Sequence, residues 1–147
     1  MKVLIDADAC PVVDLAISAC RRYGISCRLL CDTAHVLYRE GVETLVVDKG
    51  ADSVDFALVN RVMKNDIVIT QDYGLASMCL ARQARVLHQD GWEYTPYNID
   101  ALLFQRHASR EYRAAGGRLK GPAKRKSDQD KAFAQAIDRL LQQSVQG

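Results

Sequence analysis

The feature that most constrains the fold is a regular alternation of short apolar segments with longer segments of helical spacing. Five short segments have the composition of buried strands, namely "KVLI", "SCRLLC", "ETLVV", "DIVIT" and "ARVLH". Amphipathic patterns lie between them, such as "ADSVDFALVNRVMKN", which begins with acidic residues and repeats apolar residues at helical intervals. Strands that alternate with helices form parallel sheets covered on both faces. The sequence therefore predicts a three-layer α/β/α fold with a central, mostly parallel sheet of five strands.

Length and composition indicate the class of protein. A chain of 147 residues is expected to form a single domain, 1–147, with a core of its own. No apolar run approaches the length of a membrane span, and Asp6 interrupts "KVLI" too early for a signal peptide. We therefore expect a cytoplasmic protein that contacts no membrane. The five cysteines are odd in number and form no CxxC pair, so we expect reduced thiols.

The pattern becomes entirely helical after "GWEYTP". Asn98 is a candidate cap for a helix that "GG" at 116–117 ends. The polar segment 114–130 is predicted to be a basic mobile loop within the domain. A last helix follows, and its apolar stripe can dock on the body of the protein. This stripe consists of Phe133, Ile137, Leu140 and Leu141.

Aspartates follow all five predicted strands. In chain order they are Asp6, Asp32, Asp48, Asp72 and Asp90. The carboxyl ends of parallel strands meet at one edge of a sheet, where open α/β proteins bind their ligands. Aspartate is also a common helix cap and turn residue, and we expect Asp32, Asp48 and Asp90 to have that role. Asp6 and Asp72 follow the strands expected at the sheet centre, which favours a site there.

Three further aspartates can reach the same edge. Asp52 and Asp55 have the spacing i, i+3, so both lie on one face of a helix's first turn. If Asp52 caps that helix, Asp55 is left to project toward the edge of the sheet. Asp8 can either cap the first helix or contribute to the site.

Several carboxylates in one cleft repel each other unless a cation is present. Mg²⁺ and Mn²⁺ match sites made only of oxygen ligands, and the three histidines are too scattered for zinc spacing. A carboxylate-held metal pair can activate water and stabilise the leaving oxygen in phosphodiester cleavage. A single ion used only for binding or folding is the alternative.

Charge is distributed unevenly along the chain. Residues 1–105 carry a net charge of −4, whereas residues 106–147 carry +6. Residues 106–126 alone contain eight Lys or Arg and a single acid, Glu111. An acidic body joined to a basic end suggests a polyanionic partner, although a solvated, charged tail has the same composition.

Part of this basic region has helical spacing, with arginines at 106, 110 and 113. Such a stripe can neutralise phosphates, and a neighbouring aromatic ring can stack on an unpaired base. Together with the predicted acidic site, this stripe leads us to expect nucleic acid as the partner. The candidate nucleic-acid-binding residues are Arg106, Arg110, Arg113, Arg118, Lys120, Lys124 and Arg125.

Three stretches resemble the PIN-domain pattern: "VLIDAD", "ADSVDFALV" and "DIVITQDYGLA". That resemblance implies metal-dependent ribonuclease chemistry on a parallel sheet. Asp6 matches the acid that ends the first strand, and Asp55 matches the acid of the later helix. Asp72 matches the acid of the Thr-x-Asp motif, in which Thr70 precedes it. The resemblance thus implies that Asp6, Asp55 and Asp72 are metal ligands with a catalytic role. We expect Asp8 to assist them as a further catalytic residue.

PIN nucleases usually have one more acid, often Glu, between the first and third strands. Glu40 and Glu43 lie in that interval, but no motif assigns either of them. Asp8 is a possible substitute.

A closer resemblance, over nearly the whole chain, is to the YaiI/YqxD family of bacterial PIN-like proteins. It rests on "DADACPV", "TQDYGLA", "NID" with "RH", and "GGRLKGPAKR".

Two other functions remain open. "LIDADACPV" also resembles the Asp-x-Asp opening of haloacid-dehalogenase phosphatases, in which the first Asp is phosphorylated. The later motifs are in the reverse of that family's order, and Cys10 stands where Thr or Val is usual. A non-catalytic module that binds RNA or protein is the second alternative, and the incomplete acid set favours it. Cys10 itself is expected to be a small packed residue rather than a nucleophile.

Overall fold

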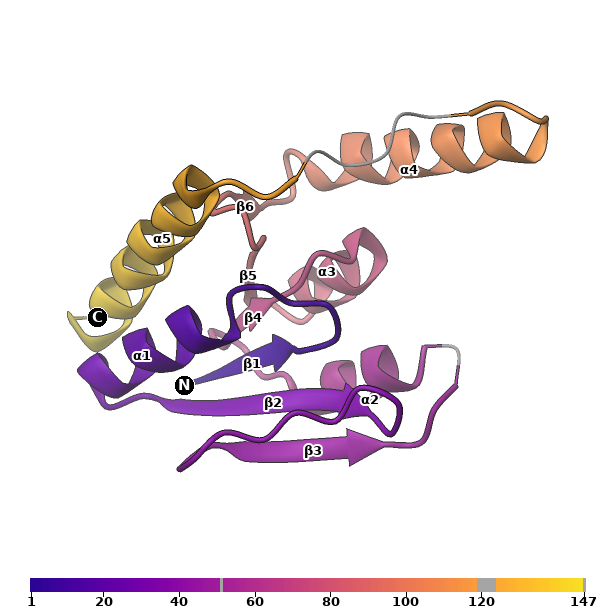
Figure 1. The fold of residues 1–147 in the computed structure, drawn as a ribbon. Coiled ribbons are helices and arrows are strands. Elements are labelled where there is room, and N and C mark those ends of the chain that lie inside the picture. The colour runs from indigo at the N-terminus through magenta and orange to yellow at the C-terminus, as the bar shows by residue number, and fades with distance from the viewer. Residues whose placement is uncertain (51, 119–123, 147) are drawn as a thin grey trace.

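The strands predicted from the sequence lie in one sheet, with helices on both of its faces (Figure 1). The computed structural model of the chain describes residues 1–50, 52–118 and 124–146. Its strands are β1 (Lys2–Asp6), β2 (Ser26–Asp32), β3 (Glu43–Val47), β4 (Ile67–Ile69), β5 (Arg85–Leu87) and β6 (Glu93–Tyr94). Its helices are α1 (Val13–Tyr23), α2 (Ser53–Arg61), α3 (Tyr73–Ala81), α4 (Ile99–Ala114) and α5 (Ser127–Gln146).

The sheet has the strand order β3-β2-β1-β4-β5-β6. The pairs between β3 and β5 are all parallel, and β1 and β4 are its central strands, as expected. The predicted number of five strands is wrong, because β6 adds a sixth that runs antiparallel to β5. This strand has only two residues, Glu93 and Tyr94, so it is too short to show the two-residue periodicity by which strands are recognised.

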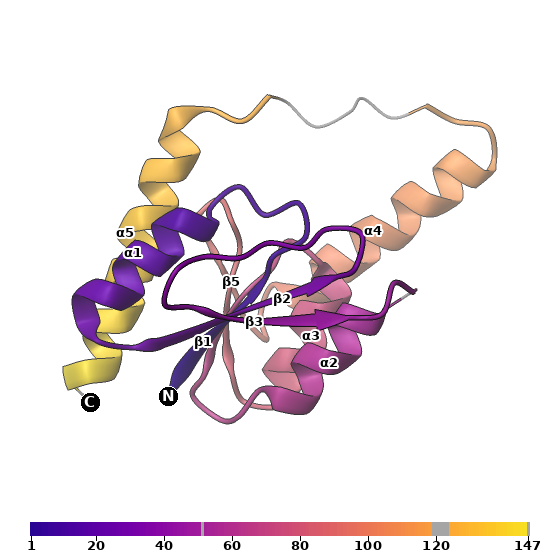
Figure 2. The same ribbon diagram turned by 60° about the horizontal axis from the view of Figure 1, so that its bottom comes forward.

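Alternate residues of the central strands face two separate cores. Val3 and Ile5 of β1 pack with α1 and α5, whereas Leu4 packs with α2, α3 and the start of α4. Figure 2 shows these two groups of helices on opposite sides of the sheet. The stripe predicted on the last helix is buried, so the docking of α5 on the body is confirmed. Its side chains are Phe133, Ile137, Leu140 and Leu141. Together these contacts confirm the three-layer α/β/α arrangement.

The ends of the helices differ in detail from the predictions. The segment 114–130 is not a loop throughout, because α4 extends through Ala114 and α5 begins at Ser127. The acidic residues at the start of α5, such as Asp128, favour a helix N-terminus, which explains the earlier start. Residues 119–123 lie outside the described part of the chain. Asn98 and Asp52 occupy the N-cap positions of α4 and α2, but neither side chain makes a capping hydrogen bond.

The structure also describes the state of the cysteines and the character of the helices. All five cysteines are free thiols, three of them buried in the cores. Within the described residues, none of the helices combines the length and the apolar character needed to cross a bilayer.

Candidate functional site

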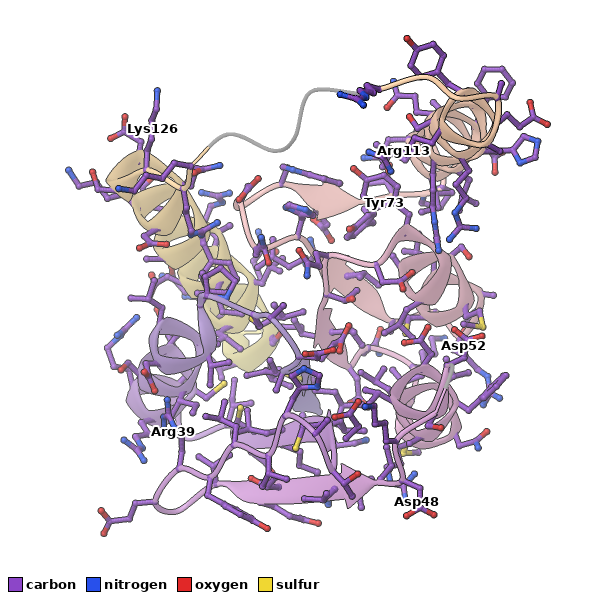
Figure 3. The ribbon with its side chains drawn as sticks, turned by 45° about the vertical axis from the view of Figure 1, so that its right-hand side comes forward. Arg39, Asp48, Asp52, Tyr73, Arg113 and Lys126 are labelled. Carbon is purple, nitrogen blue, oxygen red and sulfur yellow. The ribbon has the colours of Figure 1, made fainter. Side chains whose placement is uncertain are left out.

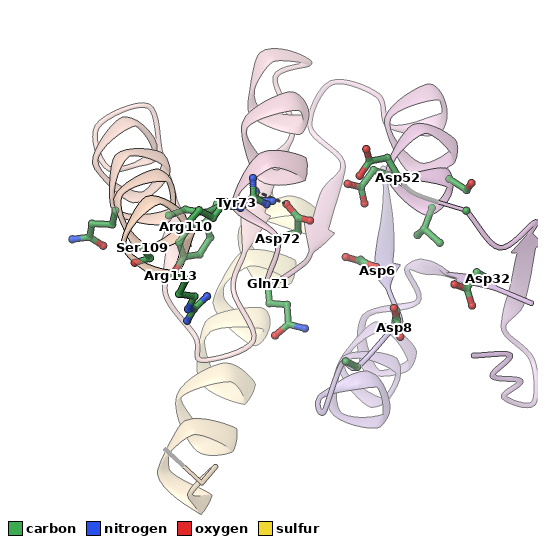
Figure 4. A pocket seen from close by; sticks show the side chains of 17 residues that line it. Asp6, Asp8, Asp32, Asp52, Gln71, Asp72, Tyr73, Ser109, Arg110 and Arg113 are labelled. Carbon is green, nitrogen blue, oxygen red and sulfur yellow. Dashed lines mark hydrogen bonds and ion pairs between the residues drawn. The ribbon is translucent and has the colours of Figure 1, made fainter. Parts of the chain in front are cut away.

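A cleft of about 910 Å³ opens at the carboxyl edge of the sheet. One wall consists of the ends of β1 and β2 and the first turns of α2 and α3, and the other is a face of α4 (Figure 4). Six carboxylates line it: Asp6, Asp8, Asp32, Asp52, Asp55 and Asp72. Three arginines of α4 line it as well: Arg106, Arg110 and Arg113. The topology thus brings an acidic wall and a basic wall to the same cleft.

Thr70 links the two acids that follow the central strands. Its hydroxyl donates to Oδ2 of Asp6 at 2.8 Å, and the hydroxyl oxygen of Thr70 accepts from the backbone N–H of Asp72 at 3.0 Å. Thr70 is only 2% exposed, so both hydrogen bonds are protected from water. This geometry gives a physical reason for the Thr-x-Asp spacing, because one hydroxyl positions both carboxylate-bearing segments.

Asp72 has structural partners as well as a place in the cleft. It is the N-cap of α3, and its Oδ1 accepts from the backbone N–H of Leu75 at 3.1 Å. The same oxygen lies 3.3 Å from Nη1 of Arg106. In the described part of the chain, Oδ2 of Asp72 accepts no hydrogen bond, so one oxygen is left to face the cleft.

The acidic wall carries more negative charge than its surroundings compensate. Burial raises the pKa of Asp6 to about 6; the Thr70 hydrogen bond opposes that rise, and the charges of Asp55 and Asp72 add to it. Burial also raises the pKa of Asp55 to about 6, assisted by Asp72 and Asp52 and opposed by Arg106. A bound cation would favour the ionised form of both groups.

Asp8 and Asp32 meet at the other end of the cleft. His35 Nδ1 lies 2.9 Å from Oδ1 of Asp32 and 3.5 Å from Oδ1 of Asp8. The hydrogen bond between His35 and Asp32 lowers the pKa of Asp32 and raises the pKa of His35. Among the described residues, this trio alone has ligand atoms all within 4.8 Å of one another. Asp6, Asp55 and Asp72 are therefore spaced more widely than that.

Two of the sequence predictions for these acids can be compared with the structure. Asp32 accepts from the backbone N–H of Ala34 at 2.9 Å, so its predicted role in a turn is confirmed, but it also lines the cleft. Its position after β2, next to β1, is the sequence signal that could have included it in the site. Asp8 does not cap α1, because Val12 holds the N-cap position. The side chain of Asp8 lines the cleft instead.

The two glutamates considered for the fourth acid do not line this cleft. Glu43 begins β3, so it lies at the amino edge of the sheet, 3.3 Å from Nε of Arg28. Glu40 precedes β3 at that same edge, and the backbone carbonyl of Glu40 accepts from Arg21. Asp8 and Asp32 are consequently the two acids between β1 and β3 that lie in the cleft.

Only part of the predicted basic set gathers at the site. Figure 3 shows Arg113 of α4 along the same side of the molecule as Tyr73 and Asp52. Arg118 and Lys124 are exposed and do not line the cleft, and Lys120 lies outside the described residues.

Arg125 lies two residues before the start of α5 and is held by three oxygens of the protein. It donates to Oδ1 of Asp90 and to Oδ1 of Asp130, each at 2.7 Å, and to the backbone carbonyl of Gln89 at 2.8 Å. These contacts tie α5 to the turn between β5 and β6.

Sequence reasoning overlooked Tyr73, which lines the cleft beside Asp72. Its ring packs edge-on against Trp92 and Tyr94, at centroid distances of 6.4 Å and 5.9 Å. Tyr94 is 1% exposed, so it is a packed residue of the core. Cys10 is half-buried, and burial raises the pKa of its thiol, which is the environment of a packed residue rather than of a nucleophile.

The chain matches the model of a family described as "Uncharacterized BCR, YaiI/YqxD family" over residues 4–143. It belongs to the YaiI/YqxD family. A "UPF0178 protein" of Exiguobacterium sibiricum is 52% identical over 96% of this chain and 96% of its own length. A "UPF0178 protein" of Ruminiclostridium cellulolyticum is 45% identical over 100% of this chain and 96% of its own. No solved structure matches the chain significantly.

Proposed function

We propose that this chain is a nuclease that depends on a divalent cation and hydrolyses phosphodiester bonds of RNA in the cleft at the carboxyl edge of its sheet. The observation that carries the proposal is the composition of that cleft. Acidic side chains from four segments form one wall, and three arginines of a single helix form the opposite wall. An RNA strand carries phosphates that suit the arginines and scissile bonds that suit a metal site among the carboxylates.

The donor set fits a hard divalent cation. Every carboxylate of the wall offers oxygen ligands, which Mg²⁺ and Mn²⁺ prefer. Burial, with the charges of neighbouring acids added to it, raises the pKa values of Asp6 and Asp55, and a bound cation would offset both effects. Asp6, Asp55 and Asp72 are the residues that would hold the cation. When bound there, it would activate water and stabilise the charge that develops on the phosphate.

The protein's own residues prepare the substrate for this chemistry. Thr70 holds Asp6 in place, and the N-terminus of α3 holds Asp72, so both acids are oriented before substrate arrives. Arg110 and Arg113 are exposed on the opposite wall, where they can bind phosphates on either side of the scissile bond. Asp8 adds negative charge next to Asp6 and can complete the ligand set.

Cleavage of labelled RNA with Mn²⁺, with Mg²⁺ and with a chelator tests the proposal. Wild type should cleave only with a divalent cation, and Asp6→Asn and Asp72→Asn should each abolish cleavage. Asp66→Asn is a matched control, because it makes the same chemical change at the amino edge of the sheet. Activity that survives both site substitutions would exclude this cleft as the active site.

One observation favours a second function, a module that binds RNA without cutting it. Asp72 already caps a helix and pairs with Arg106, so it has partners without any metal. RNA binding that is equal with a cation or a chelator, together with no cleavage of any nucleic acid, would favour this second function over the first.

A further inference from the structure

Arg106 reaches from α4 to the acidic wall. Its Nη1 lies 3.3 Å from Oδ1 of Asp72, and each of the two side chains is 34% exposed. Its charge also acts on Asp55, whose rise in pKa it opposes. One guanidinium thus serves two acids that we assigned to the cation.

Gly74, the second residue of α3, makes room for this contact. A Cβ at that position would lie 3.0 Å from Nη1 of Arg106 and 3.3 Å from Oδ1 of Asp72. Both distances are tighter than most real contacts of a Cβ, so a side chain there would force the guanidinium and the carboxylate to shift by a few tenths of an ångström. Glycine, which is otherwise unfavourable within a helix, lets Arg106 and Asp72 meet without that shift.

The other two arginines of the basic wall differ from Arg106. Arg110 and Arg113 line the same cleft, yet no ion pair joins either of them to an acid of the described residues. They come from the same face of α4 as Arg106 and differ from it in lacking the contact with Asp72, which makes Arg110 a suitable control.

We propose that Arg106 is an internal counter-ion that competes with the divalent cation for Asp72 and, once displaced, binds a phosphate of the substrate. The inference rests on the proposed function, since it assumes a cation site at Asp6, Asp55 and Asp72. Arg106 holds the acidic wall together while no cation is bound. Binding of the cation releases the guanidinium from Asp72, and the released guanidinium can then bind a phosphate of the substrate.

The physical basis is a competition between two positive charges for one carboxylate. A divalent cation carries twice the charge of a guanidinium in a smaller volume, so it wins the competition, but it must overcome the existing ion pair. The displaced guanidinium is repelled by the cation and has free donors arranged for a phosphate. Metal binding and phosphate binding are then coupled, each strengthening the other.

Titration of the full chain with Mn²⁺ alone, followed by calorimetry, tests the competition. We expect Arg106→Gln to bind Mn²⁺ about tenfold more tightly than wild type, because a neighbouring positive charge is removed. The control Arg110→Gln should bind with an affinity within about twofold of wild type, because its charge is not paired with Asp72. Asp72→Asn should bind more weakly than wild type.

Gly74→Ala separates position from charge. It keeps the net charge and should lengthen the contact between Arg106 and Asp72 by a few tenths of an ångström, so we expect Mn²⁺ binding to tighten in the same direction as in Arg106→Gln but by a smaller factor. Alanine is the better helix former, so this variant should fold. Unchanged or weaker binding by Gly74→Ala would contradict the proposed competition.

A second measurement follows the freed arginine. Binding of an RNA with phosphorothioate linkages, which resist cleavage, is measured with Mn²⁺ and with a chelator. Mn²⁺ should strengthen RNA binding by wild type, and Arg106→Gln should lose most of that increase. An increase that is the same in both proteins would overturn the inference.

The outcomes separate the inference from the proposed function. Equal Mn²⁺ affinity in wild type and Arg106→Gln, with weaker binding by Asp72→Asn, overturns the inference and leaves the cation site standing. Tightening by Arg106→Gln and Arg110→Gln to the same degree also overturns it, since the effect would then be a general one of charge. If neither wild type nor Arg106→Gln binds Mn²⁺, both the inference and the cation site are wrong.

Discussion

The two edges of the sheet use aspartate in opposite ways. At the amino edge, Asp66 is 2% exposed and accepts from the backbone N–H of Lys2, from Lys2 Nζ and from the backbone N–H of Met63, at 3.0, 2.6 and 2.8 Å. At the carboxyl edge, Asp6 accepts one side-chain hydrogen bond, from Thr70, and faces the charges of Asp55, Asp72 and Asp8.

The difference between the edges lies in how far each carboxylate is compensated. Asp66 has a cation and two backbone donors, so its burial needs nothing further. Asp6 lies among the like charges of neighbouring acids. The guanidinium of Arg106 pairs with one of these acids, Asp72. A buried carboxylate whose partners all come from the protein is typical of a structural role. A cluster of carboxylates that lack such partners is typical of a functional site.

The largest effect should come from Asp6→Asn. We expect RNA cleavage to fall by about a hundredfold or more, because the variant removes a ligand charge at the proposed site. Its stability without metal should be no lower than that of wild type, because a poorly compensated buried charge is lost. Cleavage rates and urea unfolding measure the two effects, and a large loss of stability would mean that Asp6 is a structural tie like Asp66.

Asp66→Asn should have the reverse effect. The ammonium of Lys2 would lose its buried counter-charge, and we expect a loss of about 3 kcal/mol in the free energy of unfolding. Cleavage by the folded fraction should be unchanged, since Asp66 lies at the opposite edge of the sheet. Urea unfolding and an activity assay at low temperature test this, and a loss of activity in the fully folded variant would remove the contrast between the edges.

The edges should also differ in their dependence on pH. The pKa of Asp6 is about 6 in the folded chain and 3.8 is its ordinary value, so between these values the folded state binds more protons. Stability without metal should therefore fall as pH rises through this window, by about 3 kcal/mol for Asp6. Urea unfolding at a series of pH values should show a smaller fall in Asp6→Asn. Added Mn²⁺ should restore stability above the window.

The basic wall can be tested by salt dependence. Replacing Arg106, Arg110 and Arg113 with Gln removes three phosphate contacts, so the slope of log affinity for single-stranded RNA against log salt should decrease by about 2. Arg82→Gln is a control, since Arg82 is exposed at the other end of α3. A slope that stays as steep as in wild type would place the RNA elsewhere on the protein.

The smallest effect is expected at Arg125. Because this arginine already binds Asp90, Asp130 and Gln89, we expect Arg125→Met to lower the free energy of unfolding by about 1 kcal/mol. RNA affinity should change less than it does in Arg110→Gln. An equal loss of RNA affinity in the two variants would support the sequence-based prediction that Arg125 binds nucleic acid.

Periodicity predicted most of the fold because burial repeats along the chain in a way that reflects local structure. The apolar run Val3–Ile5 indicates a strand buried on both faces, and the stripe that contains Phe133 and Ile137 indicates a docked helix. The two-residue β6 carries no such repeat, and its pairing with Val86 and Leu87 depends on the turn that brings it back. The same limit explains why the sequence predicted five strands instead of six.

The candidate site was predictable to the extent that it follows from strand direction. Asp6 and Asp72 leave adjacent parallel strands, so they had to arrive at one edge. Sequence reasoning assigned Asp32 to a turn only. Its place in the cleft follows from its contact with His35, which also lies near Asp8, and the sequence does not show these contacts. Glu43 could be set aside only when its place at the opposite edge was known.

The sequence by itself determined the alternation of strands and helices, the acidic edge and the basic stripe on α4, because these depend on spacing within short segments. Only the tertiary structure decided which charges meet. Thr70 and Asp6 are 64 residues apart, and Arg106 and Asp72 are 34 apart. Packing of the helices on the sheet determines such pairs. It therefore decided that the side chains of Asp66 and Arg125 find their hydrogen-bond partners within the protein. It also decided that Asp6 and Asp55 share a cleft with the arginines of α4.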